Sequence, residues 1–447
     1  MSPLFRRPNR LILVSLGLIL AACAGPATLP PPAVTIVSPA TDAATQDPEA
    51  LPQPGLTVSA PTPTALGVIP ATTAPTALPR YGPDTYPEGV NPLTGESVDP
   101  ARLARIPVAV KITNFPLSAR PQWGLSLADL VFEHLAEAGL TRFTAIFLQN
   151  DAAKVGSIRS ARFIDAEIAP MFQAVLVTSG SSFGTMDKLR RTAWFLGADL
   201  WRLVSEESAY NCPPLCRETP DDTNTLFTST DAVRQVLATK TTQGLGRPDL
   251  NGLAFYAQAP AGAPAVTELA IRFSAAAQVS WRYSPESGRY LRWQEKEPGG
   301  ELVAHVDALT NSPITAANVV LLQANHVNNY VPEDFRDGGN CGVEIQLWTS
   351  GPARVFRDGV MIEGRWVRDQ TTGMRLRLLD AAGNPMALKP GNTWFDLVTL
   401  NAVLAQNGPL FSVTNKVPDT KTGCPVPPTA TPDPLATPAG GDVTPTP

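Results

Sequence analysis

The sequence predicts an α+β protein. Its body is expected to hold a layered, sandwich-like α/β domain over residues 81–262 and a mainly β domain over residues 263–424. In the first part, apolar strand-like runs alternate with segments suited to helices, whereas after about residue 266 short strand-like runs follow one another with turn signals between them. The chain also has 46 Pro in 447 residues, about twice the usual share, which indicates disordered stretches beside the folded body.

The N-terminus resembles a bacterial lipoprotein signal. Three arginines precede the apolar run Leu11–Ala22, which is shorter than the roughly 20 apolar residues of a membrane-spanning helix. The run ends in Leu20-Ala21-Ala22-Cys23, which resembles the lipobox whose cysteine is lipidated and becomes the first residue of the mature chain. We therefore predict a signal peptide over residues 1–22 and a membrane anchor through an acylated Cys23, on the extracytoplasmic side of the cell membrane. An ordinary signal with a chance cysteine is the alternative.

Two segments are expected to be disordered. Residues 23–80 form a Pro/Thr/Ala-rich tether, in which Asp42, Asp47 and Glu49 are the charged residues between Ala24 and Pro79. The tail over residues 425–447 has the same Thr-Pro character. Removing the signal peptide takes away three Arg and no acid, so the formal charge changes from -5 to -8. This acidic balance excludes the basic stripe typical of a nucleic-acid binder.

The expected strands of the first domain are Ile106–Ile112, Leu130–Ala136, Thr141–Leu148 and Ala174–Thr178. Leu130–Ala136 is ambiguous between helix and strand, and we favour a strand because Gly139 would then turn a hairpin into Thr141–Leu148. Asp231–Thr241 suits a helix. The expected strands of the second domain are Val279–Tyr283, Tyr290–Trp293, Asn318–Gln323, Glu344–Trp348, Ala353–Phe356, Arg375–Leu379 and Trp394–Val398.

Four cysteines remain when Cys23 is acylated. Cys212 and Cys216 lie close together, so a local disulfide between them would leave Cys341 to pair with Cys424. An extracytoplasmic protein favours disulfides. A zinc site of four thiolates is the competing interpretation, which is weakened because the last two cysteines lack a close-spaced partner.

A series of blocks in the body resembles the YerB-like lipoproteins, the DUF3048 family. The blocks in the first domain begin at Asn91-Pro92-Leu93-Thr94-Gly95 and include Ala119–Ser126, Ala128–Glu133 and Val155–Arg162. Later blocks resemble the C-terminal domain of that family, among them His305-Val306-Asp307 and Leu388–Trp394. The resemblance implies a two-domain, usually lipid-anchored envelope protein. The family has no established biochemical activity, so no catalytic residue is implied.

Polar residues of the first domain form the main candidate site. Two arginines three positions apart, Arg159 and Arg162, would project from one face if their segment were a helical turn. Arginine suits bidentate capture of carboxylate or phosphate, so these residues predict a cleft for an anionic envelope ligand. The alternative is internal pairing of the arginines with Asp129 and Glu133. The full set is Asn114, Arg120, Gln122, Asp129, Glu133, Arg142, Arg159, Ser160 and Arg162.

A second candidate is the turn after Ala174–Thr178. Ser181 and Ser182 lie in a small-residue turn before a helix-like stretch, and backbone N–H groups at such a turn favour anions. The segment also has the G-x-S-x-G pattern of a nucleophile elbow with Ser182 at its centre. A serine hydrolase would need an acid and a histidine further along, and Asp307 and His326 occur in that order.

The leading functional hypothesis is binding or scaffolding of an anionic cell-envelope ligand, without catalysis. The alternatives are an envelope hydrolase using Ser182 and a structural partner of another envelope protein. The three histidines, His134, His305 and His326, show no metal-binding spacing, so no metal or other cofactor is expected.

Overall fold

The computed structural model describes residues 79–196, 202–206, 212–240, 248–334, 339–369 and 374–425. These residues belong to one compact unit. The predicted signal peptide, Cys23, nearly all of the tether and nearly all of the tail lie outside the described residues, so they stay predictions.

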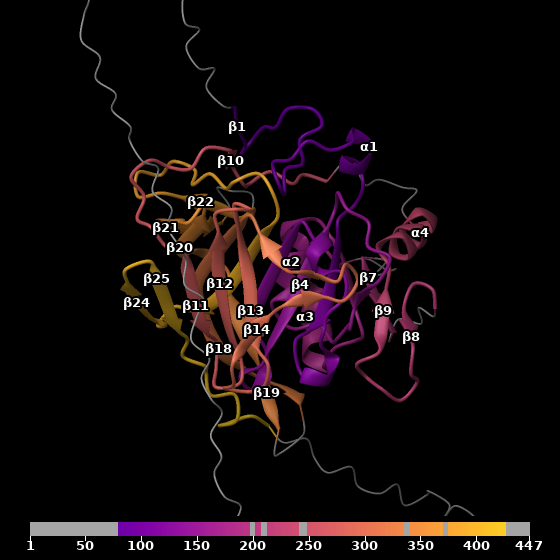
Figure 1. Cartoon of the computed structure of the whole chain (residues 1–447). Helices are drawn as coiled ribbons and strands as arrows, with labels where there is room; N and C mark the ends of the chain where they lie inside the picture. The colour runs from indigo at the N-terminus through magenta and orange to yellow at the C-terminus, as the bar shows by residue number, and fades with distance from the viewer. Residues whose placement is uncertain are drawn as a thin grey trace, which may run out of the picture. The chain divides into compact units, whose positions relative to one another are not determined.

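A mixed sheet of 11 strands runs through the centre of the described body (Figure 1). Its order is β22 (Arg377–Leu379), β21 (Val360–Arg368), β20 (Thr349–Arg357), β18 (Asn318–Asp334), β23 (Thr393–Thr399), β3 (Leu130–Leu135), β4 (Thr141–Phe147), β2 (Val108–Thr113), β6 (Val175–Thr178) and β7 (Leu203–Ser205), and β19 (Asn340–Gln346) pairs with β18. Strand β23 lies between β18 and β3 and is parallel to both. Both sequence halves therefore contribute to one sheet, and the predicted domain boundary at residue 263 stays a prediction.

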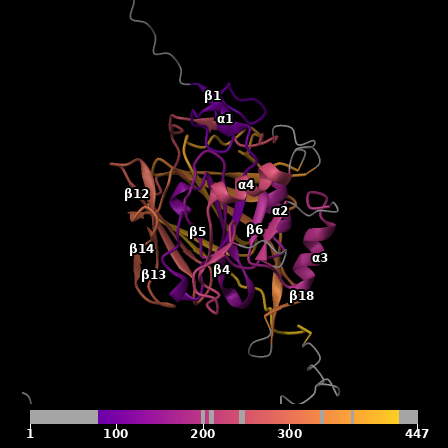
Figure 2. The same ribbon diagram turned by 90° about the vertical axis from the view of Figure 1, so that its right-hand side faces the viewer.

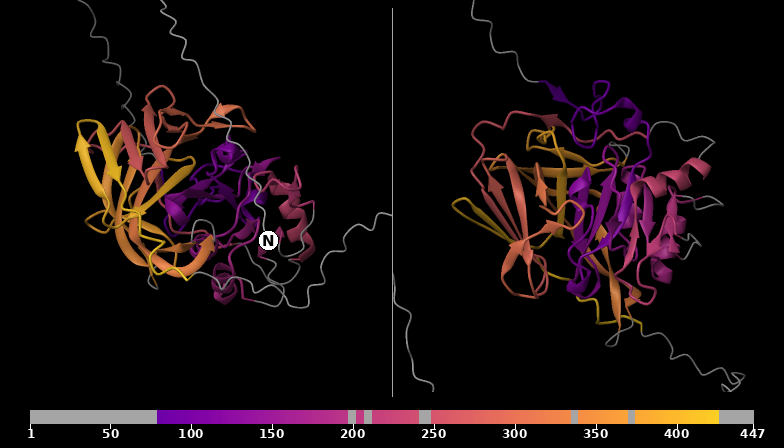
Figure 3. Two further views of the ribbon diagram at one scale, coloured as in Figure 1. Left: turned by 90° about the horizontal axis from the view of Figure 1, so that it is seen from below. Right: turned by 45° about the vertical axis from the view of Figure 1, so that its right-hand side comes forward.

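A second sheet of seven strands comes entirely from the second half of the sequence. Its members are β14 (Leu302–Ala304), β13 (Arg289–Glu295), β12 (Gln278–Ser284), β11 (Glu268–Arg272), β25 (Leu410–Thr414) and β24 (Val403–Asn407), with β17 (Thr315–Ala316) paired to β13. Strands β11 to β14 follow one another as antiparallel hairpins, and β25 returns parallel to β11. The left view of Figure 3 shows these orange and yellow strands beside the indigo strands of the first half.

The central sheet is buried on both faces. Along β18, Val319 and Leu321 join a core with the seven-stranded sheet, whereas Val320 and Leu322 join a second core on the opposite face. Successive side chains of a strand point to opposite faces, so a strand covered on both sides is apolar at most positions. This is why the predicted strands appear in the sequence as continuous apolar runs.

Few helices accompany the sheets. They are α1 (Pro100–Leu103), α2 (Asp165–Met171), α3 (Phe183–Arg191) and α4 (Thr230–Lys240), with short 3-10 turns η1 (Leu117–Ala119), η2 (Leu125–Leu127) and η3 (Glu137–Gly139). Figure 2 shows α2, α3 and α4 on the side turned toward the viewer. Apolar residues of α2 and α3 belong to the core on the face of the central sheet opposite the seven-stranded sheet. The small strands are β1 (Arg80–Tyr81), β5 (Val155–Gly156), β8 (Cys216–Arg217), β9 (Leu226–Thr228), β10 (Phe255–Tyr256), β15 (Val306–Asp307) and β16 (Ser312–Pro313).

The described body is rich in strands and has few helices, and the predicted α+β layout with a sandwich-like first domain stays a prediction. The ambiguous run after Leu130 is a strand, and it forms the expected antiparallel hairpin with β4. The predicted segment Arg159–Arg162 is not helical, because α2 starts only at Asp165. Strands β11, β21, β24 and β25 were not predicted, and β18 extends far beyond its predicted end at Gln323.

Both predicted disulfides are present. Cys212 bonds to Cys216, and Cys341 bonds to Cys424. The two bridges use all four thiols, so the alternative of a zinc site of four thiolates is wrong.

Candidate functional site

The structure distributes the predicted polar residues over three separate locations. Asn114, Arg120, Gln122 and Glu133 join one buried network between the two sheets. Asp129 lies apart from them at the start of β3. The others meet at a corner beside the N-terminus of α3, and they are Arg142, Arg159, Ser160, Arg162, Ser181 and Ser182.

The network between the sheets is built on Arg120 and Gln122. Arg120 donates to the side chain of Asn114 at 3.1 Å and to Glu295 Oε1 at 2.6 Å. Gln122 Oε1 lies 2.7 Å from Nε2 of the buried His305. These partners come from both halves of the sequence, so Arg120 helps to hold the halves together and its charge is already neutralised by Glu295.

Glu133 has a buried partner that the sequence did not reveal. Arg292 on β13 donates to Glu133 Oε2 at 2.6 Å, and both side chains are 1% exposed. The Arg292 guanidinium also faces three aromatic rings, with its carbon 5.3 Å from the centre of Phe143, 5.8 Å from Trp281 and 5.0 Å from Trp394. A ligand cannot reach a guanidinium that is enclosed in this way.

Asp129 has a local structural role. Its carboxylate accepts hydrogen bonds from Asn91 Nδ2 at 2.6 Å and from the backbone N–H of Leu148 at 2.8 Å. Burial raises the pKa of Asp129 to about 6, although these hydrogen bonds act in the opposite direction. The alternative of internal pairing therefore has other partners than Asp129 and Glu133: Arg120 pairs with Glu295, and Arg142 and Arg162 pair with Glu137.

We call the third location the arginine corner, defined as Arg142, Arg159, Ser160, Arg162, Ser181 and Ser182 together with Glu137 and Glu333. Two loops meet there. The N–H of Ala161 donates to Gly180 O at 2.8 Å, and the N–H of Ser179 donates to Arg159 O at 3.2 Å. The backbone thus fixes the loop before α2 against the turn between β6 and α3.

Two of the corner arginines, Arg142 and Arg162, form ion pairs with Glu137. Arg162 Nε donates to Glu137 Oε2 at 2.6 Å, and Arg142 donates to Glu137 Oε1 at 3.0 Å. Burial acts to raise the pKa of Glu137, but Arg142 and Arg162 outweigh it and hold the pKa well below its usual range. Burial, followed by the charge of Arg162, lowers the pKa of Arg142 to about 10.

Arg159 and the end of β18 complete the corner. Arg159 is partly exposed and donates to Thr223 O at 3.3 Å. Glu333 lies 3.6 Å from Arg162 and accepts from the Thr185 hydroxyl, and its own side chain is buried. The corner therefore holds three arginines and two glutamates, which gives a net charge of +1.

Ser182 caps helix α3. Its hydroxyl accepts from the N–H of Thr185 at 3.2 Å, which satisfies one of the N–H groups left open at a helix start. Its φ of -63° and ψ of 159° are an unstrained extended conformation. A nucleophile elbow instead holds its serine on a strained turn. Next to it, Phe183 is 89% exposed.

The predicted partners of a Ser182 hydrolase lie elsewhere. The Asp307 carboxylate accepts from the N–H groups of Gly124 at 2.9 Å and Ser126 at 2.7 Å. His326 is buried, with Nδ1 2.9 Å from Ala324 O. Within the described part of the chain neither residue contacts Ser182, so the elbow pattern in the sequence does not form a triad.

A buried lysine cluster was missed by the sequence analysis. Lys111 is fully buried on β2, and its Nζ lies 2.9 Å from Asp165 and 2.6 Å from His134 Nε2. Burial lowers the pKa of Lys111 to about 8 and that of His134 to about 3. No sequence signal marked this cluster, because its members lie on three separate elements and meet only in the fold.

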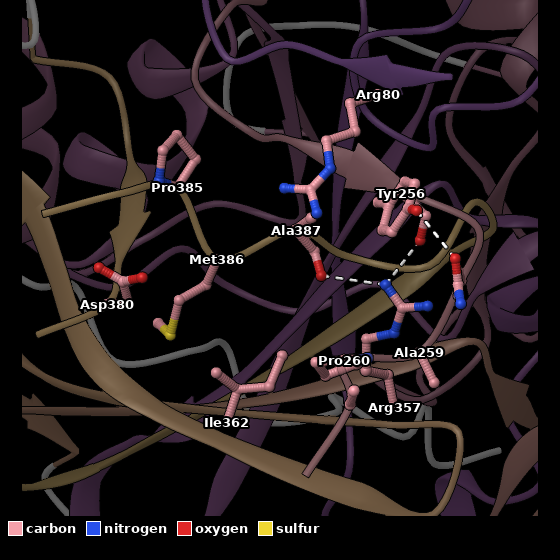
Figure 4. A pocket seen from close by; sticks show the side chains of 12 residues that line it. Arg80, Tyr256, Ala259, Pro260, Arg357, Ile362, Asp380, Pro385, Met386 and Ala387 are labelled. Atoms are coloured by element: carbon pink, nitrogen blue, oxygen red, sulfur yellow. Dashed lines mark hydrogen bonds between the residues drawn. The ribbon is translucent and has the colours of Figure 1, made fainter. Parts of the chain in front are cut away.

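A pocket of about 340 Å³ lies where the tether enters the body (Figure 4). The guanidinium of Arg80 covers the ring of Tyr256 at 4.2 Å from its centre, and Ile362 and Met386 supply apolar walls. Arg357 donates to Tyr256 O at 2.7 Å and to Ala387 O at 3.1 Å. Its nitrogens also reach Asp358 and the backbone of residue 257, so this buried arginine has no donor left for a ligand.

Family models match most of the body. Residues 93–243 match the N-terminal domain, and residues 269–395 the C-terminal domain, of DUF3048, described as a protein of unknown function. The Bacillus subtilis (strain 168) protein named "Putative lipoprotein YerB" is 28% identical over 323 residues, which cover 71% of this chain and 88% of that protein. The crystal structure of YerB from Bacillus subtilis matches with a TM-score of 0.55 and 25% identity, over 69% of this chain and 96% of that one.

Among the helices that the structure describes, none has the length and apolar character needed to cross a membrane.

Proposed function

This chain belongs to the DUF3048, or YerB-like, family, and from that premise we propose that it is a lipid-anchored envelope protein that binds an anionic envelope ligand at the arginine corner. The anchor is supported by the lipobox-like sequence ending at Cys23 and by the lipoprotein name of the Bacillus subtilis relative. The acidic, Pro-rich segment after Cys23 would separate the body from the membrane surface.

The observation that carries the binding proposal is the place of the corner in the sheet. Strands β2, β6 and β7 are parallel neighbours, and the corner follows the carboxyl end of β6. Ligands of open sheets with parallel strands bind beyond the carboxyl ends of those strands. The turn over residues 179–182 leads from β6 directly into α3, so the N–H groups at the start of α3 lie at that edge.

Charge and exposure favour an anion there. The corner has a net charge of +1, and a helix N-terminus adds a partial positive charge. Arg142 and Arg162 are paired with Glu137, so they would attract an anion through their charge without contacting it. Arg159 is partly exposed and would contact the ligand. The exposed ring of Phe183 offers an apolar surface to the body of the same ligand.

A thermal-shift and titration screen of the full-length chain tests this proposal. Phosphorylated glycans, inorganic phosphate and small carboxylates are compared on the wild type, on Arg159→Ala and on the control Arg272→Ala, an exposed arginine on β11. A ligand at 100 times its dissociation constant adds about 2.7 kcal/mol of stability. We expect a shift that Arg159→Ala removes and Arg272→Ala keeps. A shift unchanged in Arg159→Ala refutes the corner as the site.

A second candidate function, docking of a protein partner, is favoured by one edge of the seven-stranded sheet. Leu400 and Val403 are 52% and 55% exposed at the start of β24, and β24 is the last strand of its sheet. Residues 397–415 contain no charged side chain, whereas exposed edges usually carry charges that prevent strand addition. Cross-linking in the native envelope, with Val403→Lys as the variant, tests it: a partner lost in the variant supports this function, and an unchanged partner refutes it.

A further inference from the structure

An open pocket of about 520 Å³ lies at the β20–β22 end of the central sheet and shares no residue with the arginine corner. Its floor is formed by β20, β21 and β22, and its rim by residues 83–84 and the turn over residues 383–385. Small-ligand sites measure about 300–1,000 Å³, so the pocket has the size of one.

The strand register determines which side chains share the floor. Arg365 on β21 lies opposite Leu379 on β22, and Val367 lies opposite Arg377. Side chains directly opposite each other in an antiparallel pair lie on the same face, and diagonal neighbours are about 7–8 Å apart. Arg365 and Arg377 are such diagonal neighbours.

Most charges near the pocket already have partners. On the same face Arg354 donates to Glu363 at 2.8 Å, and Arg377 pairs with Asp84 at the rim. Asp369 at the far end of the pocket has an interaction of its own. The remaining charge is that of Arg365.

Arg365 is exposed, and its guanidinium makes no hydrogen bond or ion pair with any residue of the described body. On the neighbouring strand, Arg377 Nε also has no acceptor among the described residues, although this nitrogen is itself buried. A buried donor without an acceptor is costly, so such groups normally have a partner. Two arginines from adjacent strands that line this pocket thus have donors without an acceptor among the described residues.

We infer that this pocket binds the carboxylate of a small ligand with an apolar body, of the kind presented by the C-terminus of a short apolar peptide. The carboxylate accepts from the exposed guanidinium of Arg365. Pro83, Val367, Leu379 and Pro385 contact the apolar part. Asp84 and Asp369 disfavour a dianion such as phosphate, so a single negative charge fits best.

Isothermal titration of the full-length chain with acetyl-alanyl-alanine, and with the same dipeptide as its C-terminal amide, tests the inference. Only the acid supplies the carboxylate, so the amide is expected to bind at least about tenfold more weakly. Arg365→Ala is expected to weaken binding of the acid by a similar factor, and Arg365→Lys to retain part of it.

Two controls make the result specific. Arg272→Ala removes another exposed arginine, and Arg159→Ala disables the arginine corner; both are expected to bind the acid as the wild type does. Arg365 has no partner in the described part of the chain, so Arg365→Ala should keep the wild-type melting temperature, which is measured first. The inference is overturned if acid and amide bind equally, if Arg365→Ala binds like the wild type, or if the acid does not bind at millimolar concentration. Loss of binding in Arg159→Ala would also overturn it, because the pocket would then not be a separate site.

Discussion

The buried ion pair between Arg292 and Glu133 offers the sharpest test of how the two halves of the sequence are joined. The pair is 2.6 Å long, both side chains are 1% exposed, and Phe143, Trp281 and Trp394 surround the guanidinium. In Arg292→Met, Glu133 would stay buried without its counter-charge. Removal of one partner from a buried pair typically costs about 3–5 kcal/mol, and the lost contacts between cation and rings add to this.

The assay is urea unfolding at pH 7, arranged as a double-mutant cycle. Arg292→Met is expected to lower the free energy of unfolding by about 4 kcal/mol, and Arg292→Met/Glu133→Gln to recover at least about half of that loss, because no buried charge then lacks a partner. The matched control is Arg354→Met, which breaks the pair with Glu363, whose side chain is 59% exposed. That change is expected to cost at most about 1 kcal/mol. A loss in Arg292→Met no larger than in the control would refute the reasoning.

Three further outcomes are expected. Burial lowers the pKa of His326 to about 4, so as the pH falls the unfolded chain is protonated at this residue before the folded chain is, and the stability that the neutral ring provides is lost between about pH 6.5 and pH 4. His326→Leu should therefore make the urea midpoint less dependent on pH over that range. An unchanged slope of midpoint against pH would contradict this. Replacing both cysteines of Cys341–Cys424, which are 83 residues apart, with serine should lower the free energy of unfolding by about 4.5 kcal/mol through loop entropy, and the same change in Cys212–Cys216 by about 2 kcal/mol. Calorimetry that gives the reverse order would be inconsistent with this account. The fragment 79–262 should not fold alone, because β3 would lose its neighbour β23, and a dispersed amide NMR spectrum would disprove this.

The strands of the body could be predicted because their signal is local. Runs such as Val108–Thr113 and Val175–Thr178 are buried on both faces, so most of their residues are apolar and the runs stand out in the sequence, although Lys111 interrupts the first. Strand β21 was missed since Glu363, Gly364 and Arg365 interrupt its pattern on an open face. The turn before α3 was found for a similar local reason, since its small residues lie between an apolar run and a helix-like stretch.

The candidate site was only partly predictable. The sequence placed Arg142, Arg159 and Arg162 in one candidate set, and the fold does bring them together, but their principal partner, Glu137, was not identified. Arg120 was placed in the same set and lies in a different network, with Glu295. Residue type indicates that an arginine can bind an anion, whereas its availability to a ligand depends on whether the fold places a carboxylate of the protein beside it.

The sequence by itself indicated the many strands of the second part, a helix after the turn over residues 179–182 and the favoured pairing of the four body cysteines, since each depends on residues close in the chain or on simple elimination. Only the tertiary structure decided which charged side chains are neutralised by internal ion pairs. Arg120 and Glu295 are 175 residues apart, and Glu133 and Arg292 are 159 apart. Coulomb attraction depends on the distance between charges in space and not on their separation in the sequence. Strand β23 lies between β18 and β3 and is parallel to both, which brings the two halves of the sequence into one sheet. The same folding that neutralises these arginines leaves Arg365 in an open pocket without a partner among the residues that the structure describes.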